Sequence, residues 1–297
     1  RALRHFELAR KRGMRVIAKI QAGNTWELSA VPYLPAVENV ARHAENLRKA
    51  GVDGLMLGWT LGGHPSPNLE VVAEMGRTPA PTADEAMARV ATRRWGPALA
   101  PQVVEAWRLA SAAFREFPFH VQTVYQAPLQ VGPANLLWEA PTRLKATMIG
   151  FPYDDLEGWR AVYPPEIWIT QLLKVADGFD RAAALLGDPA LREEQGLVEA
   201  ASIHFRSTAH QARFVLLRRG LENAAGGPER DRVLKELGSV LREEMGLARR
   251  LAELQSADAR IGFEASNHYY YRPIDLAEKI LNCRDLLDRW LPSQGNR

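Results

Sequence analysis

The chain has 297 residues, of which 46% are hydrophobic and 25% are charged, with a formal net charge of +3. This composition excludes a globally disordered chain and is sufficient for one large domain or two ordinary ones. Acidic and apolar residues interrupt the basic runs, whereas a nucleic-acid-binding protein concentrates its basic residues in a stripe. No stretch approaches the ~20 apolar residues that cross a bilayer. We therefore expect no nucleic-acid partner and no membrane span.

Cysteine and histidine usage argues against a metal site. The single cysteine, Cys283, can form neither an intrachain disulfide nor a cysteine-based metal site, and its apolar neighbours predict a buried position on a helix. His204 and His210 are six residues apart on a predicted helix, so they do not share one face. We predict no metal and no other cofactor.

The first residues say little about the compartment. The chain begins Arg-Ala-Leu, without an initiator methionine or an apolar signal segment, as expected of a processed or truncated chain. The compartment therefore stays open, with a cytoplasmic location favoured.

Strand-like and helical patterns alternate over the first 80 residues. In chain order they are the end of a helix at 1–12, a buried strand at 15–22, a helix at 36–50, a second buried strand at 54–60 and a glycine-rich loop at 61–68. Glycines close both helices, as is usual at helix C-termini. A strand, a helix and a second strand form the repeat unit of parallel sheets and barrels.

Helical patterns dominate after residue 82. They lie at 83–95, 101–116, 165–187, 191–222, 228–256 and 273–290, and an irregular aromatic-rich stretch occupies 118–163. Two parallel strands alone bury too little surface to be stable. Either the missing strands lie upstream of residue 1 or another chain supplies them, and we expect the first. The predicted fold class is α/β plus all-α: the C-terminal part of a (β/α)8 TIM barrel at 1–80, followed by a helical-bundle domain at 81–297.

The segment Asn-Thr-Trp-Glu at 24–27 directly follows the first predicted strand. Strand-to-helix loops of this kind build the active sites of α/β barrels. The indole of Trp26 suits the CH face of a pyranose, and the Glu27 carboxylate can bind hydroxyls or transfer protons. We therefore take Glu27 as the candidate catalytic residue, with Asn24 and Trp26 as substrate-binding residues. Alternatively, Trp26 packs on the helical domain and Glu27 caps the next helix.

The second predicted strand ends in a similar loop. Trp59 closes the strand, and paired glycines precede His64. Glycines let the backbone approach a ligand closely, so Trp59 is a candidate pocket wall and His64 a candidate substrate contact. The alternative is a proline-stiffened loop with an exposed histidine.

Glycoside hydrolysis usually needs two carboxylates, about 5–5.5 Å apart for retention or about 6.5–9.5 Å apart for inversion. Glu27 has no obvious partner nearby in the sequence, so the principal pair is expected upstream. Asp154, in an Asp-Asp pair before a short helical segment, is a further candidate for substrate contact. Neighbouring side chains on an irregular loop rarely converge, however, and an N-cap role before Leu156 explains one member of that pair simply.

A third cluster, Gly-Phe-Glu-Ala-Ser-Asn-His-Tyr-Tyr-Tyr at 262–271, lies between two predicted helices. Its density of polar and aromatic groups is unusual for a connector. Glu264, Asn267 and His268 are therefore candidate substrate contacts. The alternative is a plug at a domain interface, with half-buried tyrosines whose hydroxyls are hydrogen-bonded.

Residues 24–35, 54–68 and 262–271 together resemble a group of uncharacterised bacterial glycoside-hydrolase-like proteins. The general plan is similar to family 20 hexosaminidases and family 67 α-glucuronidases, in which a (β/α)8 barrel carries extra domains. The Asp-Glu pair that family 20 enzymes carry at the end of a middle barrel strand has no match here. The resemblance therefore implies a barrel, a carbohydrate pocket and a helical appendage, but neither a sugar nor a reaction.

Three functions compete at this point. The first is an exo-acting glycoside hydrolase that cleaves an oligosaccharide or glycoside, with Trp26 and Trp59 as pocket walls. The second is a non-catalytic carbohydrate-binding protein on a degenerate barrel. The third is a helical protein-interaction module formed by residues 83–290. We predict the first; the sugar, the anomer, the stereochemical outcome and the oligomeric state stay open.

Overall fold

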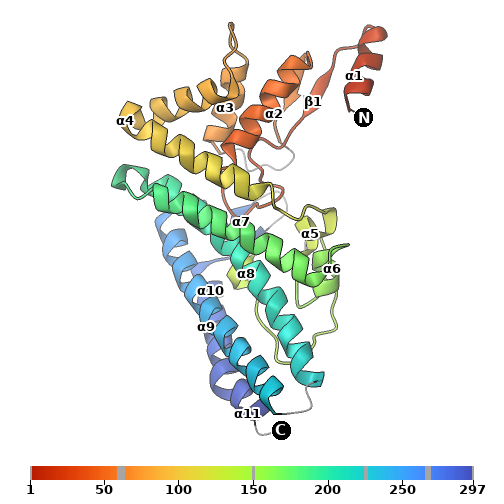
Figure 1. Ribbon diagram of the computed structural model, residues 1–297, viewed down its shortest axis with the longest axis vertical. Coiled ribbons are helices and arrows are strands. Elements are labelled where there is room, and N and C mark those ends of the chain that lie inside the picture. The colour runs from red at the N-terminus through yellow and green to blue at the C-terminus, as the bar shows by residue number, and fades with distance from the viewer. Residues whose placement is uncertain (1, 59–63, 149–150, 224–226, 265–268, 296–297) are drawn as a thin grey trace.

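A computed structural model describes residues 2–58, 64–148, 151–223, 227–264 and 269–295 (Figure 1). Within these ranges the chain is mostly helical. The molecule is elongated: the N-terminal elements lie at one end and the helices α9 (Pro228–Ala257), α10 (Pro273–Asp285) and α11 (Leu291–Gly295) reach the other.

The N-terminal end contains a parallel two-stranded sheet. Strand β1 (Ile17–Lys19) pairs in register with β2 (Gly54–Met56), and α2 (Val37–Lys49) connects them. The predicted strand–helix–strand unit is therefore confirmed. The preceding helix α1 (Ala2–Lys11) ends just before Gly13, whose φ of 71° only glycine adopts freely.

The predicted TIM-barrel fragment is wrong. Apart from the short hairpin of β3 (Phe263–Glu264) and β4 (Tyr269–Tyr270), the described residues contain only β1 and β2, each three residues long. The apolar runs from which a barrel was predicted contribute only these short strands. One face of the sheet is also open, with Ile17 69% and Met56 54% exposed, whereas parallel sheets in barrels are covered on both faces. An apolar run indicates a strand, but it does not show how many other strands lie beside it.

The predicted domain boundary at residue 80 stays a prediction. Buried side chains from both sides of it belong to one continuous core, which extends from Ile20 to Leu276. Helix α3 (Pro67–Met75) and helix α4 (Ala83–Phe114) join the sheet to the rest of this core. Shorter elements complete the chain: α5 (Val121–Gln126), η1 (Gly132–Ala134), α6 (Leu156–Arg160) and η2 (Pro189–Leu191).

Local sequence signals set the boundaries of α3 and α4. Ser66 caps α3 with its side chain, and Thr82 forms a capping box with Glu85 at the start of α4. Gly96, at φ 80° and ψ 166°, interrupts α4 just before Pro97. The helix is thus two stretches joined at a kink, which agrees with the predicted helices at 83–95 and 101–116.

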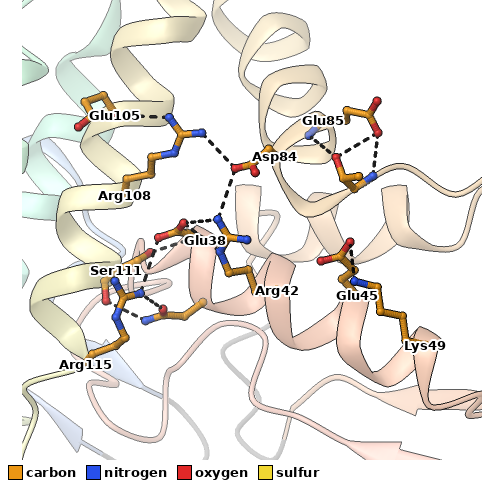
Figure 2. Close-up of polar contacts among 12 residues, drawn as sticks. Glu38, Arg42, Glu45, Lys49, Asp84, Glu85, Glu105, Arg108, Ser111 and Arg115 are labelled. Atoms are coloured by element: carbon orange, nitrogen blue, oxygen red, sulfur yellow. Dashed lines mark hydrogen bonds and ion pairs between the residues drawn. The ribbon is translucent and has the colours of Figure 1, made fainter.

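An ion-pair network ties α2 to α4 (Figure 2). Arg42 reaches Glu38 on its own helix at 2.8 Å and Asp84, in the first turn of α4, at 3.6 Å. Arg108, further along α4, binds Asp84 at 3.0 Å. The backbone N–H of Glu38 donates to Ser111 Oγ at 3.1 Å. Exposed pairs of this kind contribute at most about 1 kcal/mol each, so their main effect is to fix how the two helices meet.

The C-terminal part is a helical bundle, as predicted. Helices α7 (Pro165–Leu185), α8 (Arg192–Asn223), α9 and α10 pack in sequence, each against the next. Proline occupies the first turn of α7, α9 and α10, where its missing N–H costs nothing. The predicted helix at 273–290 is α10 followed by a π-helical turn, Leu286–Trp290.

Candidate functional site

The three segments that carry the resemblance meet in the structure. The first is the loop at 23–35, here called the site loop, which follows β1. Asn68, at the start of α3, donates from Nδ2 to the carbonyls of Ala22 at 2.7 Å and Leu34 at 2.9 Å. The backbone N–H of Gly262 donates to Ala30 O at 2.7 Å. Segments separated by more than 200 residues are thus joined at the carboxyl end of the sheet.

The site loop has a defined conformation. The Leu34 N–H donates to Gly23 O at 2.8 Å and closes the loop on itself, while Leu28 and Leu34 are fully buried. Asn24 has a φ of 51°, in the left-handed region that asparagine tolerates better than most residues. The loop is therefore held by its own backbone as well as by its apolar anchors.

Buried polar contacts fix the second half of the site loop, at Ser29 and Tyr33. The Tyr33 hydroxyl donates to Glu194 Oε2 at 2.5 Å, and Trp107 Nε1 donates to Glu194 Oε1 at 2.9 Å. Burial of Glu194 raises the pKa of its carboxyl. Ser29 donates from both N and Oγ to Gln130 Oε1, at 2.7 and 2.6 Å. Both oxygens of Glu194 are used, so this carboxyl has a structural role.

A second buried contact anchors the hairpin segment 262–271. The Tyr271 hydroxyl lies 2.8 Å from His204 Nε2, and His204 Nδ1 lies 2.6 Å from Leu129 O. Burial lowers the pKa of His204 to about 4. The ring is therefore neutral at pH 7, with Nδ1–H donating to the carbonyl and Nε2 accepting from the tyrosine.

The first residues of the site loop, 24–27, differ from these anchors because several of their polar atoms have no hydrogen-bond partner. Asn24 Nδ2, Trp26 Nε1 and Glu27 Oε2 are buried and make no hydrogen bond, and Asn68 Oδ1 is in the same situation. Burial raises the pKa of Glu27, and its own backbone N–H opposes this only in part. Each unpartnered buried polar group costs about 1–3 kcal/mol.

Trp26 belongs to a cluster of aromatic side chains. Its ring meets Phe119 and Tyr125 edge to face, each with a centroid distance of 5.7 Å. Phe119 is 49% exposed. Both partners come from the irregular stretch that precedes or includes α5, about 100 residues after Trp26, and no sequence spacing linked them to it.

The other predicted site residues have varied positions. His64 is half-buried and contributes to the electrostatic environment of Asp258. Glu264 lies in β3, paired with Tyr269. Trp59, Asn267 and His268 lie outside the described residues, so the predicted pairing of Trp26 with Trp59 stays a prediction.

Asp154 is engaged in a structural ion pair. Its carboxylate binds Arg218 at 2.6 Å, with both side chains almost fully buried, and it accepts a hydrogen bond from Thr142 Oγ1. Burial opposes ionisation of Asp154, but the contacts with Thr142 and Arg218 prevail and lower its pKa. The neighbouring Asp155 precedes α6 without a side-chain cap and binds Lys145 at 2.9 Å instead.

The described residues contain neither a metal-binding cluster nor a membrane-spanning helix. No group of three or more histidine, cysteine, aspartate or glutamate side chains there is placed to hold a metal ion. None of the helices described is long and apolar enough to cross a membrane.

Comparison with known proteins gives no further assignment. The chain matches no protein-family model, and no curated protein or solved structure shows significant similarity to it.

Proposed function

We propose that the site loop is a carbohydrate-binding element. The observation that carries this proposal is the set of three buried, unpartnered polar atoms within four residues: Asn24 Nδ2, Trp26 Nε1 and Glu27 Oε2. Native proteins rarely leave such groups unsatisfied, and each exception calls for an explanation. A ligand that donates and accepts hydrogen bonds from adjacent positions would satisfy all three, and a sugar ring with neighbouring hydroxyls has this property.

The aromatic cluster supports the same ligand class. Phe119 and Tyr125 hold the Trp26 ring by edge-to-face contacts, each worth about 0.5–1.5 kcal/mol beyond buried area. A ring fixed in this way loses little conformational entropy when a flat apolar surface stacks on it. Small-molecule sites usually combine aromatic surface with a small number of precisely placed polar groups.

A second candidate function, glycoside hydrolysis, is favoured by the raised pKa of Glu27. A general acid must hold its proton near the working pH, and burial achieves this for carboxyl groups. In this scheme Glu27 would protonate the glycosidic oxygen as the bond to the anomeric carbon breaks. A second carboxylate would stabilise or attack the positive centre; none of the described carboxylates is assigned that part.

Binding can be tested by isothermal titration calorimetry with a panel of neutral, acetamido and uronic-acid monosaccharides and disaccharides. We expect at least one sugar to bind with a Kd below about 1 mM, and Trp26→Ala to weaken it about tenfold or more. Trp138→Ala is the matched control, because Trp138 is 37% exposed and belongs to a different part of the chain. Absence of binding to every sugar, or equal effects of the two substitutions, would contradict the proposal.

Hydrolysis needs a separate assay, because binding alone does not imply turnover. Aryl glycosides with α and β linkages would be incubated with wild type, Glu27→Gln and Glu105→Gln. If wild type releases the aryl group, we expect Glu27→Gln to lower kcat/KM at least about tenfold, and Glu105→Gln, which changes an exposed carboxyl on α4, to leave it unchanged. Sugar binding without release by wild type would leave the binding role and remove the hydrolytic one.

A further inference from the structure

The β1–β2 sheet is covered on one face only. Val16, Ala18 and Ile20 point inward and are buried, whereas Ile17 and Met56 point outward and are exposed. Gly54, opposite Ile17, adds no side chain to the outer face. Parallel sheets are almost always covered on both faces. Within the described residues, this outer face is an exception.

Both strands also lack an outer neighbour among the described residues, because the sheet has the order β1–β2. The amides of Ile20 and Ala22 donate to carbonyls of Met56 and Leu57, so those groups face β2. The amides alternate in direction along a strand, and the amide of Ile17 therefore faces the opposite, free edge. An edge of this kind accepts an additional strand.

Helix α1 directly precedes β1 in the chain and lies near it. Figure 1 shows β1 between α2 and α1, and the Arg10 guanidinium ties α1 to the carbonyls of Ala50 and Gly51, at the end of α2. No residue of α1 is buried, and Leu3 is 61% exposed. The helix therefore packs no side chain into the core of the described residues.

The charge of this region restricts the occupant. Between residues 2 and 19 the chain has six basic residues and one acidic residue, Glu7: the basic ones are Arg4, Arg10, Lys11, Arg12, Arg15 and Lys19. Of the described side chains, Arg4, Lys11, Arg12 and Arg15 form no ion pair. A second copy of this chain would bring the same positive charge to the edge, which opposes self-association.

We propose that the free edge of β1 and the adjacent face of α1 bind an extended, acidic polypeptide segment from a partner, which adds to the sheet as a strand parallel to β1. Such a segment would pair with the free backbone groups of β1 and cover exposed apolar surface of the sheet and of α1. Its carboxylates would also neutralise the excess positive charge. The carboxyl end of the added strand would lie beside the site loop, so the partner is also placed to supply groups to that site. The proposal does not depend on sugar binding.

The test uses three fluorescein-labelled ten-residue peptides in which valine alternates with a polar residue. One has aspartate at the polar positions, one has lysine, and the third is the aspartate peptide with prolines that remove backbone donors. Fluorescence anisotropy with the intact protein should give a Kd for the aspartate peptide about tenfold or more below those of the other two. Hydrogen exchange at the Ile17 amide should slow when it binds.

Matched substitutions locate the binding surface. Ile17→Glu should weaken the aspartate peptide about tenfold or more, because it removes apolar surface and repels the peptide. Ile274→Glu, at a similarly exposed isoleucine on α10 (63% against 69% exposed), should have no effect. Circular dichroism and thermal unfolding of both variants would show that each is folded.

Several outcomes would overturn the proposal. They are no binding of the aspartate peptide up to about 1 mM, equal loss of affinity in both glutamate variants, and unchanged hydrogen exchange at the Ile17 amide. Equal affinity for an acidic helical peptide would assign the surface to a helix instead. A concentration-dependent dimer that Ile17→Glu dissociates would assign the surface to a second copy.

Discussion

The helical bundle and the site loop differ in whether an ion pair accompanies their buried polar groups. In the bundle, Glu244 and Lys279 are both fully buried, 3.0 Å apart. Ser207 Oγ donates to Glu244 at 2.8 Å and Lys279 Nζ to Asn135 O at 2.6 Å, while the second oxygen of Glu244 faces His210 Nδ1 at 3.3 Å. Glu244 Oε1 and His210 Nδ1 make no hydrogen bond, but the ion pair with Lys279 offsets the burial of the Glu244 charge.

In the site loop, Trp26 Nε1 and Glu27 Oε2 are buried without any such partner. Desolvation carries a cost wherever a polar group is buried. Where an ion pair offsets this cost, the group has a structural role. Where three such atoms fall within four residues and no ion pair accompanies them, a ligand is the simplest way to offset the cost. The comparison thus separates the polar groups that hold the fold from those that we assign to binding.

The largest effect should come from breaking the buried ion pair of the bundle. Lys279→Met removes the main cation facing Glu244 and leaves a buried carboxylate, so we expect a loss of about 3–5 kcal/mol in the free energy of unfolding. Urea unfolding at pH 7 would measure this. The double variant Lys279→Met/Glu244→Gln should recover most of the loss, since no charge then stays unpaired. A loss below about 1 kcal/mol in the single variant would mean that water reaches the pair.

His204 should give the next largest effect, as a dependence of stability on pH. Its pKa is lowered by burial from 6.5 to about 4, so the unfolded chain binds a proton at a higher pH than the folded one. Its contribution to stability is therefore fully present above pH 6.5 and is lost as the pH falls towards 4, by about 3 kcal/mol in total.

Urea unfolding from pH 7.5 to 4 would measure the slope for wild type and His204→Gln. Glutamine can donate to Leu129 O and accept from Tyr271, so it should keep the contacts and flatten the slope. His5→Gln, at an exposed histidine of α1, is the control and should leave the slope as it is. An equal slope in wild type and His204→Gln would show that acid acts elsewhere.

Sequence patterns predicted the helices better than the sheet, for a physical reason. Helix boundaries depend on neighbours in the sequence: Pro165, Pro228 and Pro273 open helices, and Gly96 divides α4. The extent of a sheet depends on pairing between distant segments. Residues 15–22 suggest a strand, but nothing in them shows that only three residues pair or that one face stays open.

The site was predictable only where its residues are adjacent in the sequence. Asn24, Trp26 and Glu27 form one motif, and each has a buried polar atom without a hydrogen-bond partner. Glu194 and Phe119, by contrast, come from parts of the chain that have no signal linking them to that motif. Tertiary packing alone brings them to the site loop.

A smaller effect, of opposite sign, is expected at Glu27. Burial raises the pKa of Glu27, so its carboxyl favours folding at low pH and opposes it once the pH rises through the folded-state pKa. Glu27→Gln removes that opposition and should stabilise the protein at pH 8 by about 1 kcal/mol, the lower end of the cost of an unpartnered polar group. At pH 4 the two proteins should be alike. Differential scanning calorimetry at both pH values measures this, and destabilisation at pH 8 would show that the carboxylate has a favourable partner.

The smallest effect should come from the open face of the sheet, and it bears directly on the proposed docking surface. Ile17 is 69% exposed, whereas Ile20, three residues on and pointing inward, is 5% exposed. Ile20→Thr should cost about 2 kcal/mol, because it puts a hydroxyl into the core, but Ile17→Thr should change the free energy of unfolding by less than about 0.5 kcal/mol. Urea unfolding of the two variants measures both free energies, and the comparison is matched because the same substitution is made at two positions close to one strand. If Ile17→Thr cost as much as Ile20→Thr, the outer face would already be covered in the isolated chain, and no partner strand would be needed there.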